Sequence, residues 1–352
     1  MISIPVMPSL DGPLSSYSTL ITINRGVGFN TPGNLYLNNK SYNWPYDIQF
    51  RYGAQEEIPH LVVFSDSATM TVWVKLKDLI ASGATQFYLF FSDPAYTNHS
   101  SESAVLFYSD PSLDILTRWR RYQFGTGNAQ NANARMELYS TSPGNEDGSY
   151  TVCKTAFPLN IKFRWVVDIS AIDYSLRPFL AVAPNPINGW PWNNNLGPDL
   201  FYMSDIGSYG GYNAQSFVIK NNVTIDQYSS GIQESGLHAF EMCITNSLQR
   251  WKYDNAIKKN HAVSLPWSHV IPGFQFANAW NAACSYYITQ LTITEFTPNE
   301  PYWGTPGAIE VPIPPTWQVS EGEYGRAHDT FPSYVRVGTW ANRRTRRGTC
   351  AV

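Results

Sequence analysis

Short runs of β-branched and aromatic residues, separated by glycine, proline, asparagine and aspartate, recur along the whole chain. Runs of this length and composition are typical of β-strands joined by turns. No long segment repeats apolar residues at helical spacing, although residues 112–121 are compatible with a helical turn or two. The sequence therefore predicts an all-β protein, with its clearest strands at residues 19–24, 70–75, 86–91, 161–168 and 287–296.

The length of the chain predicts more than one domain. At 352 residues it exceeds the size at which one hydrophobic core usually keeps growing. Hydrophobic residues make up 43%, which supplies enough apolar area to offset chain entropy. Charged residues make up only 14%, against roughly 25% in average soluble proteins. We therefore expect folded domains whose surfaces are covered mainly by uncharged polar side chains.

The first 18 residues do not have the composition of a secretion signal. They contain no lysine or arginine, and Pro5, Pro8 and Pro13 interrupt their apolar residues, whereas a signal peptide combines a basic start with an unbroken apolar stretch. The aromatic-rich, charge-poor composition is nevertheless typical of proteins that face the outside of a cell. Structural proteins of virions face the exterior without being secreted, so a virion protein is our leading hypothesis.

Two neighbouring strands in the first third of the chain carry a family resemblance. Residues 71–76 read TVWVKL and residues 85–96 read TQFYLFFSDPAY, after an opening strand at residues 20–24. Together they resemble a β-sandwich domain of unknown function found in secreted archaeal and bacterial proteins. The resemblance implies a first sandwich over residues 16–110, preceded by an N-terminal arm over residues 1–15. The family's glycine after the second strand is replaced by Ser92, so we expect the turn there to differ.

A second resemblance covers the later part of the chain. The segment GLHAFEMCIT at residues 236–245, the segment QRWKYDN at residues 249–255 and the closing strand at residues 287–296 are similar to a concanavalin-like (laminin-G-like) lectin fold. This resemblance implies a jelly-roll sandwich over residues 111–298. Alternation along the first segment places His238, Phe240, Met242 and Ile244 on the core face and Glu241 and Cys243 on the opposite face.

The composition changes after Phe296. Residues 299–352 are predicted to form a Pro-rich linker followed by an extended, basic C-terminal arm. The last 34 residues hold six arginines and three acids, so the remainder of the chain has a net charge near −6 rather than the −3 of the whole. Three roles are open for the arm: it contacts a neighbouring subunit, it contacts nucleic acid, or it packs on its own domain. We favour the inter-subunit contact, through Arg343, Arg344, Arg346 and Arg347.

A search for catalytic and metal-binding motifs finds none, so we predict no enzyme activity and no cofactor or metal. There is no nucleophile elbow, zinc-binding helix or phosphate-binding loop, and no paired-acid run of the glycosidase type. The isolated acids Asp168, Asp173, Glu241 and Asp254 are interpreted as turn, cap or exposed strand residues. Cys153, Cys243, Cys284 and Cys350 have no zinc spacing, and they are either paired in disulfides or free and buried.

One loop has the composition of a sugar-binding site. Trp190, Trp192, Asn193, Asn194 and Asn195 combine two rigid rings with amide donors and acceptors, the groups that stack on sugar faces and bond sugar hydroxyls. Subunit interfaces are also rich in tryptophan, so both interpretations stay open.

Glycosylation sequons begin at Asn39, Asn98 and Asn222. Each sequon stands in a turn-like context, which makes it a candidate for glycosylation if the host modifies this protein.

We therefore predict a non-enzymatic structural protein of a virion exterior: a turret, spike, decoration or capsid component, of an archaeal virus. Its expected partners are further copies of the chain, other virion proteins and host-surface glycans. We expect neither a membrane span, since no run approaches about 18 apolar residues, nor nucleic acid as a partner. The alternative is a carbohydrate-binding or adhesion protein of a cell surface.

Overall fold

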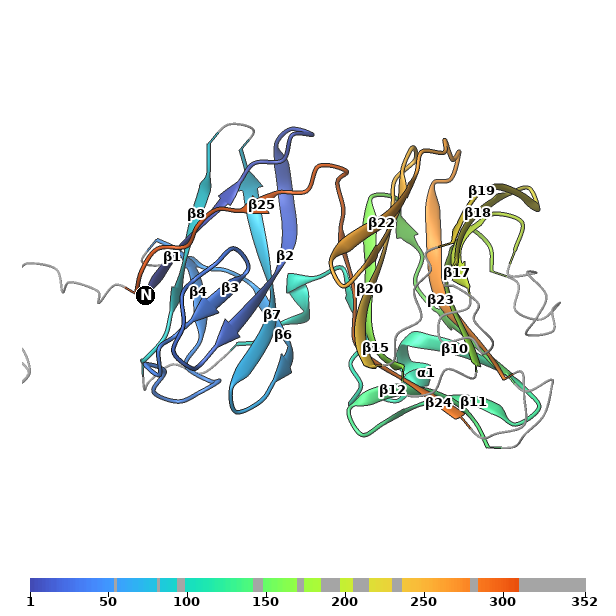
Figure 1. Ribbon diagram of the computed structural model, residues 1–352, viewed down its shortest axis with the longest axis horizontal. Helices are drawn as coiled ribbons and strands as arrows, with labels where there is room; N and C mark the ends of the chain where they lie inside the picture. Colours follow the sequence, from blue (N-terminus) through green and yellow to red (C-terminus); the bar gives the residue numbers. More distant parts are fainter. Residues whose placement is uncertain are drawn as a thin grey trace, which may run out of the picture. The chain divides into compact units, whose positions relative to one another are not determined.

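The computed structural model describes residues 1–53, 56–80, 83–93, 99–141, 148–169, 174–184, 197–204, 215–229, 236–278 and 284–309. Within these ranges the only helices are a 3-10 turn, η1 (Glu102–Ala104), and one α-helical turn, α1 (Ile115–Arg118). The strands form four sheets that pack in pairs as two β-sandwiches (Figure 1). The prediction of an all-β chain with two sandwiches is therefore confirmed.

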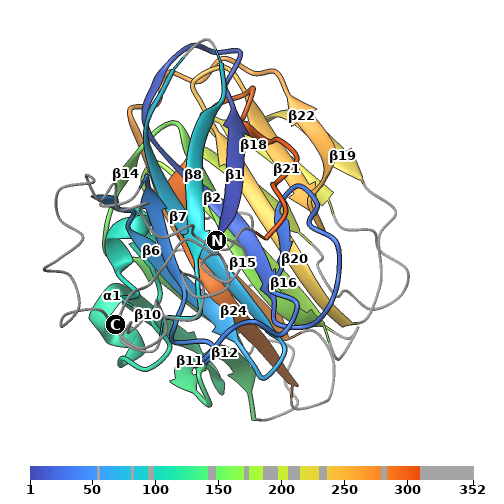
Figure 2. The same cartoon turned by 90° about the vertical axis from the view of Figure 1, so that its left-hand side faces the viewer.

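The first sandwich pairs a four-stranded sheet with a five-stranded sheet. The four-stranded sheet has the order β3 (Asn34–Tyr36), β2 (Leu14–Asn24), β7 (Thr69–Leu79) and β6 (His60–Ser65). The five-stranded sheet has the order β25 (Tyr302–Trp303), β1 (Ile2–Met7), β8 (Thr85–Phe90), β4 (Gln49–Tyr52) and β5 (Glu56–Glu57). Figure 2 looks onto this sandwich, with β1 and β8 in front of β2 and β7. Alternate side chains from both sheets form its buried core.

The second sandwich pairs two larger sheets. The β10–β19 sheet has the order β10 (Trp119–Phe124), β13 (Gly148–Cys153), β23 (His269–Asn278), β16 (Tyr174–Ala181), β17 (Leu200–Ser204), β18 (Gln215–Lys220) and β19 (Val223–Ser229), with β14 (Phe157–Pro158) also on β23. The β11–β22 sheet has the order β11 (Gly127–Ala132), β12 (Arg135–Ser140), β24 (Cys284–Glu295), β15 (Ile161–Ile169), β20 (Gly236–Ile244), β21 (Gln249–Tyr253) and β22 (Ala256–His261), with β9 (Phe107–Tyr108) also on β24.

The core of the second sandwich is built from large aromatic side chains. The Trp165 ring stacks on Phe240 with ring centroids 5.7 Å apart, and Phe274 meets Trp165 edge to face at 5.6 Å. Phe240, Met242 and Ile244 lie in this core, as alternation along their strand predicts, whereas His238 lies at its edge, stacked on Tyr253 and 2.8 Å from Asp254. Large interlocking rings explain how the chain buries enough apolar area between only two layers.

Strand positions agree well with the sequence prediction. The five clearest predicted strands lie in β2, β7, β8, β15 and β24, and the expected helical turn is α1. Two turns also follow from their residues. Asp254 and Asn255, with φ of 46° and 65°, form the tight turn between β21 and β22. At Ser92, where we expected the turn to differ, φ is 74°, so the backbone takes the left-handed conformation that favours the glycine it replaces.

The edges of the predicted domains differ from the structure in three places. Residues 1–15, expected to be an arm, contain β1, whose alternate residues Ile2, Ile4 and Val6 are buried in the first core. The expected linker after residue 299 contains β25, which pairs with β1 and so returns the chain to the first sandwich. β9 pairs with β24, so strands of the second sandwich begin before residue 111. These pairings join segments far apart in sequence, which local patterns do not encode.

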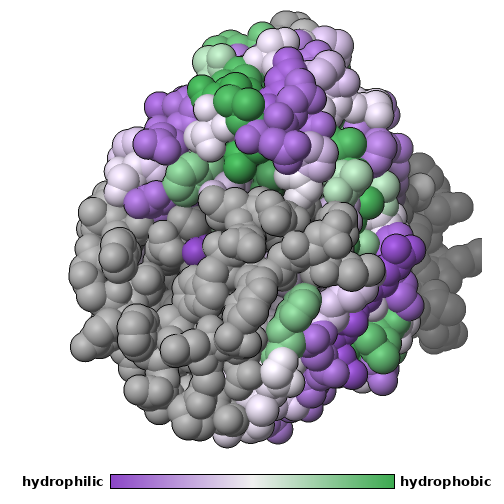
Figure 3. Space-filling model, turned by 90° about the vertical axis from the view of Figure 1, so that its right-hand side faces the viewer, coloured by the Kyte–Doolittle hydropathy of each residue, from purple (hydrophilic) through white to green (hydrophobic). Residues whose placement is uncertain are grey.

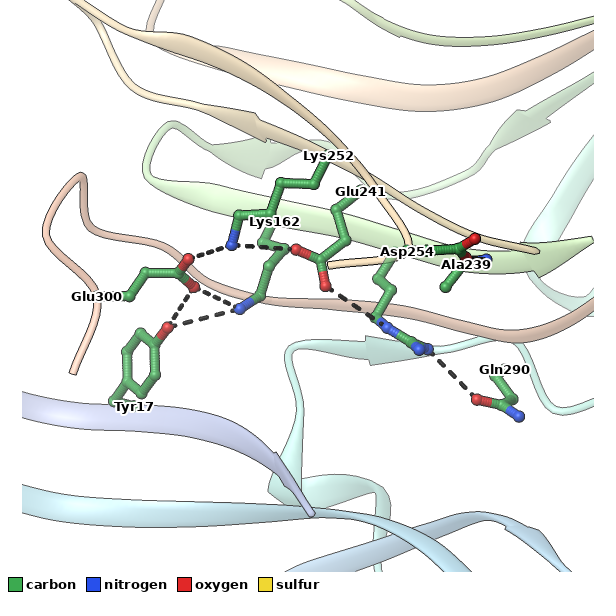
Figure 4. Close-up of polar contacts among 9 residues, drawn as sticks. Tyr17, Lys162, Ala239, Glu241, Lys252, Asp254, Gln290 and Glu300 are labelled. Carbon is green, nitrogen blue, oxygen red and sulfur yellow. Dashed lines mark hydrogen bonds and ion pairs between the residues drawn. The ribbon is translucent and has the colours of Figure 1, made fainter. Parts of the chain in front are cut away.

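A buried network of charged groups joins the two sandwiches (Figure 4). Glu300 Oε1 accepts a hydrogen bond from the Tyr17 hydroxyl of β2 at 2.5 Å and from Lys162 Nζ of β15 at 2.6 Å. Lys252 of β21 bonds the other oxygen of Glu300 and lies 3.3 Å from Glu241 Oε2. Arg164 Nε lies 3.5 Å from Glu241 Oε1. We call this set, Tyr17, Lys162, Arg164, Glu241, Lys252 and Glu300, the joint network.

The joint network is largely buried. The side chains of Lys162, Arg164 and Glu241 are only 7%, 7% and 8% exposed. Beside it, Lys75 lies 3.5 Å from Glu295 Oε1, and Ser18 donates to Glu295 Oε2 at 2.9 Å. Because buried charges are tolerated only when paired, Lys162, Arg164 and Lys252 depend on Glu241 and Glu300, while the first sandwich contributes the Tyr17 hydroxyl and the Lys75–Glu295 ion pair.

Candidate functional site

The outer face of the β10–β19 sheet, turned away from the core of its sandwich, carries two ordered rows of side chains. Antiparallel pairing places directly opposite residues on the same face, so the register defines the rows. The polar row runs across β10, β13, β23 and β16 and consists of Tyr122, Tyr150, Gln275 and Arg177. The aromatic row lies two residues further along the strands and consists of Phe179, Tyr202 and Phe217, with Gly273 and Val152 at its other end.

The polar row combines several kinds of hydrogen-bonding group. Gln275 Nε2 donates to the Tyr150 hydroxyl at 2.9 Å. Burial raises the pKa of Tyr150 to about 12, against the opposing charge of Arg177, so its hydroxyl stays protonated at ordinary pH. Tyr150, Gln275 and Arg177 are 1%, 0% and 8% exposed, so these phenol, amide and guanidinium groups interact within the protein. Tyr122, at the end of the row, is partly exposed.

The aromatic row depends on a missing side chain. A β-carbon added at Gly273 would lie 2.2 Å from Cζ of Phe179, so the ring occupies the space above that glycine. Beyond Phe179, the rings of Tyr202 and Phe217 stack with centroids 4.8 Å apart and an interplanar angle of 10°. Phe179 and Tyr202 are 0% and 2% exposed, so the row is a buried apolar layer that ends at the partly exposed Phe217. On this side of the molecule, apolar and hydrophilic residues are interspersed over the described part of the surface (Figure 3).

The predicted sugar-binding loop is rooted in this same sheet. Ala181 at the end of β16 pairs with Leu200 at the start of β17, and the chain between them contains Trp190, Trp192, Asn193, Asn194 and Asn195. These five residues lie outside the described residues, so their role stays a prediction. The returning end of the loop is held by the β18–β19 turn, where the Asn222 N–H donates to the Pro198 carbonyl at 2.9 Å.

Two of the three sequons fall on described, exposed turns. Asn39 and Asn222 are both exposed, with φ of 60° and 63°. Asn98 lies outside the described ranges, as do Arg343, Arg344, Arg346 and Arg347 of the predicted arm. Glycosylation at these asparagines and the inter-subunit contact of the arm therefore remain predictions that the structure does not test.

Of the isolated acids, Glu241 and Asp254 each contact defined partners within the protein. Glu241 was expected to be exposed if it lay on a strand, but it is buried between Arg164 and Lys252 of the joint network because the first sandwich covers that face. Asp254 is a turn residue whose carboxylate accepts from the Ala239 N–H at 2.8 Å and contacts His238 Nδ1 at 2.8 Å. Asp173 lies outside the described residues. His238 and Glu241 have separate partners, and no group of three possible metal ligands gathers among the described side chains.

A serine, a histidine and an aspartate meet in the order of a hydrolase triad. His261 Nε2 lies 2.8 Å from the Ser216 hydroxyl, and His261 Nδ1 lies 2.9 Å from Asp226 Oδ2. Ser216 and His261 are wholly buried, and Ser216 is a mid-strand residue of β18 rather than part of a sharp turn. A substrate carbonyl has no path to this hydroxyl. The three groups instead tie β18 and β19 to β22 of the opposite sheet.

This cluster predicts a stability loss in mild acid. Burial lowers the pKa of His261 below its ordinary value, although Asp226 opposes the shift; Lys259, which lies 3.8 Å from Asp226, adds to it. The unfolded chain therefore binds more protons below about pH 6.5, and stability falls as the pH drops through that value. We expect the free energy of unfolding, measured by urea titration between pH 8 and pH 5, to decline less steeply in His261→Gln. If stability declined equally steeply with falling pH in the parent chain and in His261→Gln, His261 would not be the cause of the acid-dependent loss.

The two described cysteine side chains are not reactive thiolates. Cys153 and Cys243 are free and buried, which is one of the alternatives that the sequence leaves open. Burial raises the pKa of Cys153 to about 11 and that of Cys243 further still, so both remain neutral thiols. Among the described residues, no helix has the length and apolar content that a membrane span needs.

Comparisons with known proteins give structural likenesses only. No family model matches the chain, and no curated protein matches it in sequence. Similar solved structures include the potassium-bound carbohydrate recognition domain of Emp46p (10% identity, TM-score 0.40, 52% of this chain and 90% of that one). They also include the carbohydrate-binding module CBM66 of Bacillus subtilis (10%, 0.34, 50% and 95%) and a mycobacterial glycoside hydrolase family protein (11%, 0.38, 50% and 92%). At these scores we infer neither family nor ligand from them.

Sequence reasoning did not find the rows of the β10–β19 sheet. Their members lie on strands as far apart as β10 and β23, and each residue alone has an ordinary strand context. The one signal that points to this sheet is the Trp-Asn loop between β16 and β17.

Proposed function

We propose that this chain is a non-enzymatic carbohydrate-binding protein whose binding face is the outer face of the β10–β19 sheet. The observation that carries the proposal is the pair of partly exposed rings, Tyr122 and Phe217, toward opposite edges of this face, with a layer of buried polar and aromatic side chains between them. Sugars present alternating hydroxyl edges and apolar faces, and they need both kinds of partner within a few ångströms. Adjacent rows of a strand pair are separated by about 7 Å, close to the width of one sugar ring.

The loop between β16 and β17 supplies the remaining groups in this proposal. Its base lies four residues along the strand from the polar row, or about 13 Å. Half of an 18-residue connection spans up to about 30 Å when extended, so Trp190 and Trp192 are within reach of both rows. Two tryptophan rings and three asparagine amides would then contact an oligosaccharide that extends across the sheet between Tyr122 and Phe217.

Glycan-array binding and titration of the best ligand test this function. We expect Trp190→Ala, Trp192→Ala and Tyr122→Ala each to weaken binding at least about tenfold, which corresponds to about 1.4 kcal/mol. Tyr302→Ala, an exposed tyrosine on β25 in the other sandwich, is the matched control and should leave binding unchanged. Selective binding that all three variants retain would rule out this face.

A structural role on a virion exterior is the second candidate. The joint network favours it, because a subunit of a shell or turret needs its domains held in one orientation. In this proposal the chain acts on the particle exterior, with further copies and other virion proteins as partners. The oligomeric state, measured at high protein concentration, separates the two roles. A stable monomer that binds glycans supports the first, and regular assemblies without glycan binding support the second.

A further inference from the structure

Loops at one end of the first sandwich expose several large side chains. Phe29 is 91% exposed, Tyr42 is 72% exposed and Tyr46 is 59% exposed, with Val27 beside them at 78%. Isolated exposed apolar residues are common, but several aromatic rings on neighbouring loops mark a surface that binds something. The joint network and the β10–β19 sheet use none of these residues.

Backbone hydrogen bonds hold the two loops together. The Asn38 N–H donates to the Gly26 carbonyl at 3.0 Å, and the Asn39 N–H donates to the Arg25 carbonyl at 2.7 Å. The Gly28 N–H donates to Asn38 Oδ1 at 2.9 Å. The loop that bears Val27 and Phe29 therefore lies directly against the start of the loop that bears Tyr42 and Tyr46.

A buried carboxylate fixes the second loop. Asp47 is 1% exposed and accepts hydrogen bonds from the Ser41 hydroxyl at 2.6 Å, the Tyr42 N–H at 2.6 Å and the Ser92 N–H at 3.0 Å. Trp44 Nε1 donates to the Asp66 carbonyl at 2.7 Å. These bonds hold the loop with Tyr42 and Tyr46 exposed in the free protein. Ligand binding therefore needs little further ordering of the loop.

We propose that residues 26–30 and 41–46 form a second carbohydrate-binding surface, specific for neutral saccharides. The rings of Phe29, Tyr42 and Tyr46 offer faces for stacking, and the exposed amide of Asn43 offers donors and an acceptor. Neither segment contains a charged residue, so the groups that would stack on and bond a sugar are uncharged; the exposed Arg25 and Lys40 flank the segments, which is why alginate is the acidic comparison below. Four exposed side chains match a few sugar rings, whereas a stable protein interface uses about 20–30 residues on each side.

This surface is independent of the β10–β19 face, and together the two give the chain two points of attachment. A polysaccharide that repeats the same unit can occupy both, which raises the apparent affinity without any new contact. A long neutral polysaccharide should therefore bind more tightly than its own short oligosaccharides.

Affinity electrophoresis of the full chain in gels containing soluble xylan, galactomannan, mixed-linkage β-glucan or dextran tests the inference, with alginate as the acidic comparison. We expect at least one neutral polysaccharide to retard the chain, and Tyr42→Ala/Tyr46→Ala to weaken that retardation at least about tenfold. Tyr302→Ala, whose ring is also 59% exposed, is the matched control and should migrate like the parent chain. Both altered rings are exposed, so the thermal midpoint should not change.

The outcomes separate the two surfaces. Retardation lost in the Tyr42/Tyr46 variant and kept in Trp192→Ala assigns binding to the loops, and the reverse assigns it to the β10–β19 face alone. The inference is overturned if the double variant binds every tested polysaccharide as the parent does, if alginate is the only polymer retained, or if none is retained.

Discussion

Glu300→Ala is expected to lower the free energy of unfolding by about 3–5 kcal/mol. The substitution removes the closest anion from Lys162, whose side chain is 7% exposed, and one of two anions from Lys252. Lys162 then keeps the Tyr17 hydroxyl, 3.5 Å away, but loses its closest anion while its ammonium group stays largely buried. Equilibrium unfolding in urea, followed by fluorescence, measures the loss and shows whether the sandwiches then unfold in separate steps.

An exposed ion pair provides the control. Glu102 pairs with Arg118 at 2.7 Å, but its side chain is 43% exposed, so Glu102→Ala should cost less than about 1 kcal/mol. Equal losses in the two variants would show that the joint network contributes no more than a surface pair.

Acid titration tests the same carboxylate in another way. Burial opposes ionisation of Glu300, but the charges of Lys162 and Lys252 outweigh it and hold the pKa of the carboxyl well below its usual range. A depressed folded-state pKa stabilises the protein above the ordinary value of about 4.3, and this contribution is lost as the pH falls below it. Between pH 5 and pH 3 the parent chain should therefore lose more stability than Glu300→Ala.

Gly273→Ala is expected to destabilise the second sandwich by about 1–3 kcal/mol, the range for overpacking in a dense core. The new methyl group would lie 2.2 Å from Phe179 Cζ, and Phe179 is wholly buried, so its ring has little free space to enter. Displacing that ring would also disturb the floor of the proposed binding face. Thermal unfolding measures the first effect, and titration with a bound glycan measures the second.

Two further variants make this prediction specific. Gly26→Ala adds the same methyl group where no atom lies within 4 Å, so its stability should stay within about 0.5 kcal/mol of the parent. Adding Phe179→Leu to Gly273→Ala should cost less than the two single changes together, because the smaller side chain makes room for the methyl group. Additive losses would mean that the two positions do not interact.

Local patterns in the sequence place the clearest strands of this protein, although they miss β1 and β25. β-Branched and aromatic runs mark β2, β7, β8, β15 and β24, and alternation along residues 236–245 puts Phe240, Met242 and Ile244 in the core. The turn at Asp254 and Asn255 follows from their tolerance of positive φ. Each of these features depends on interactions within a few residues, which is why the sequence alone reveals them.

Only the tertiary structure decided what those strands bring together. Tyr122, Tyr150, Gln275 and Arg177 become one row through the register of four strands, and Glu300 meets Lys162 only because the chain turns back toward the first sandwich. Pairing between distant strands depends on how whole sheets pack, and no short segment records its eventual partner. The sequence by itself determined an all-β, charge-poor chain with a Trp-Asn segment; the packing decided which sheet the strands on either side of that segment join and which charges lie buried.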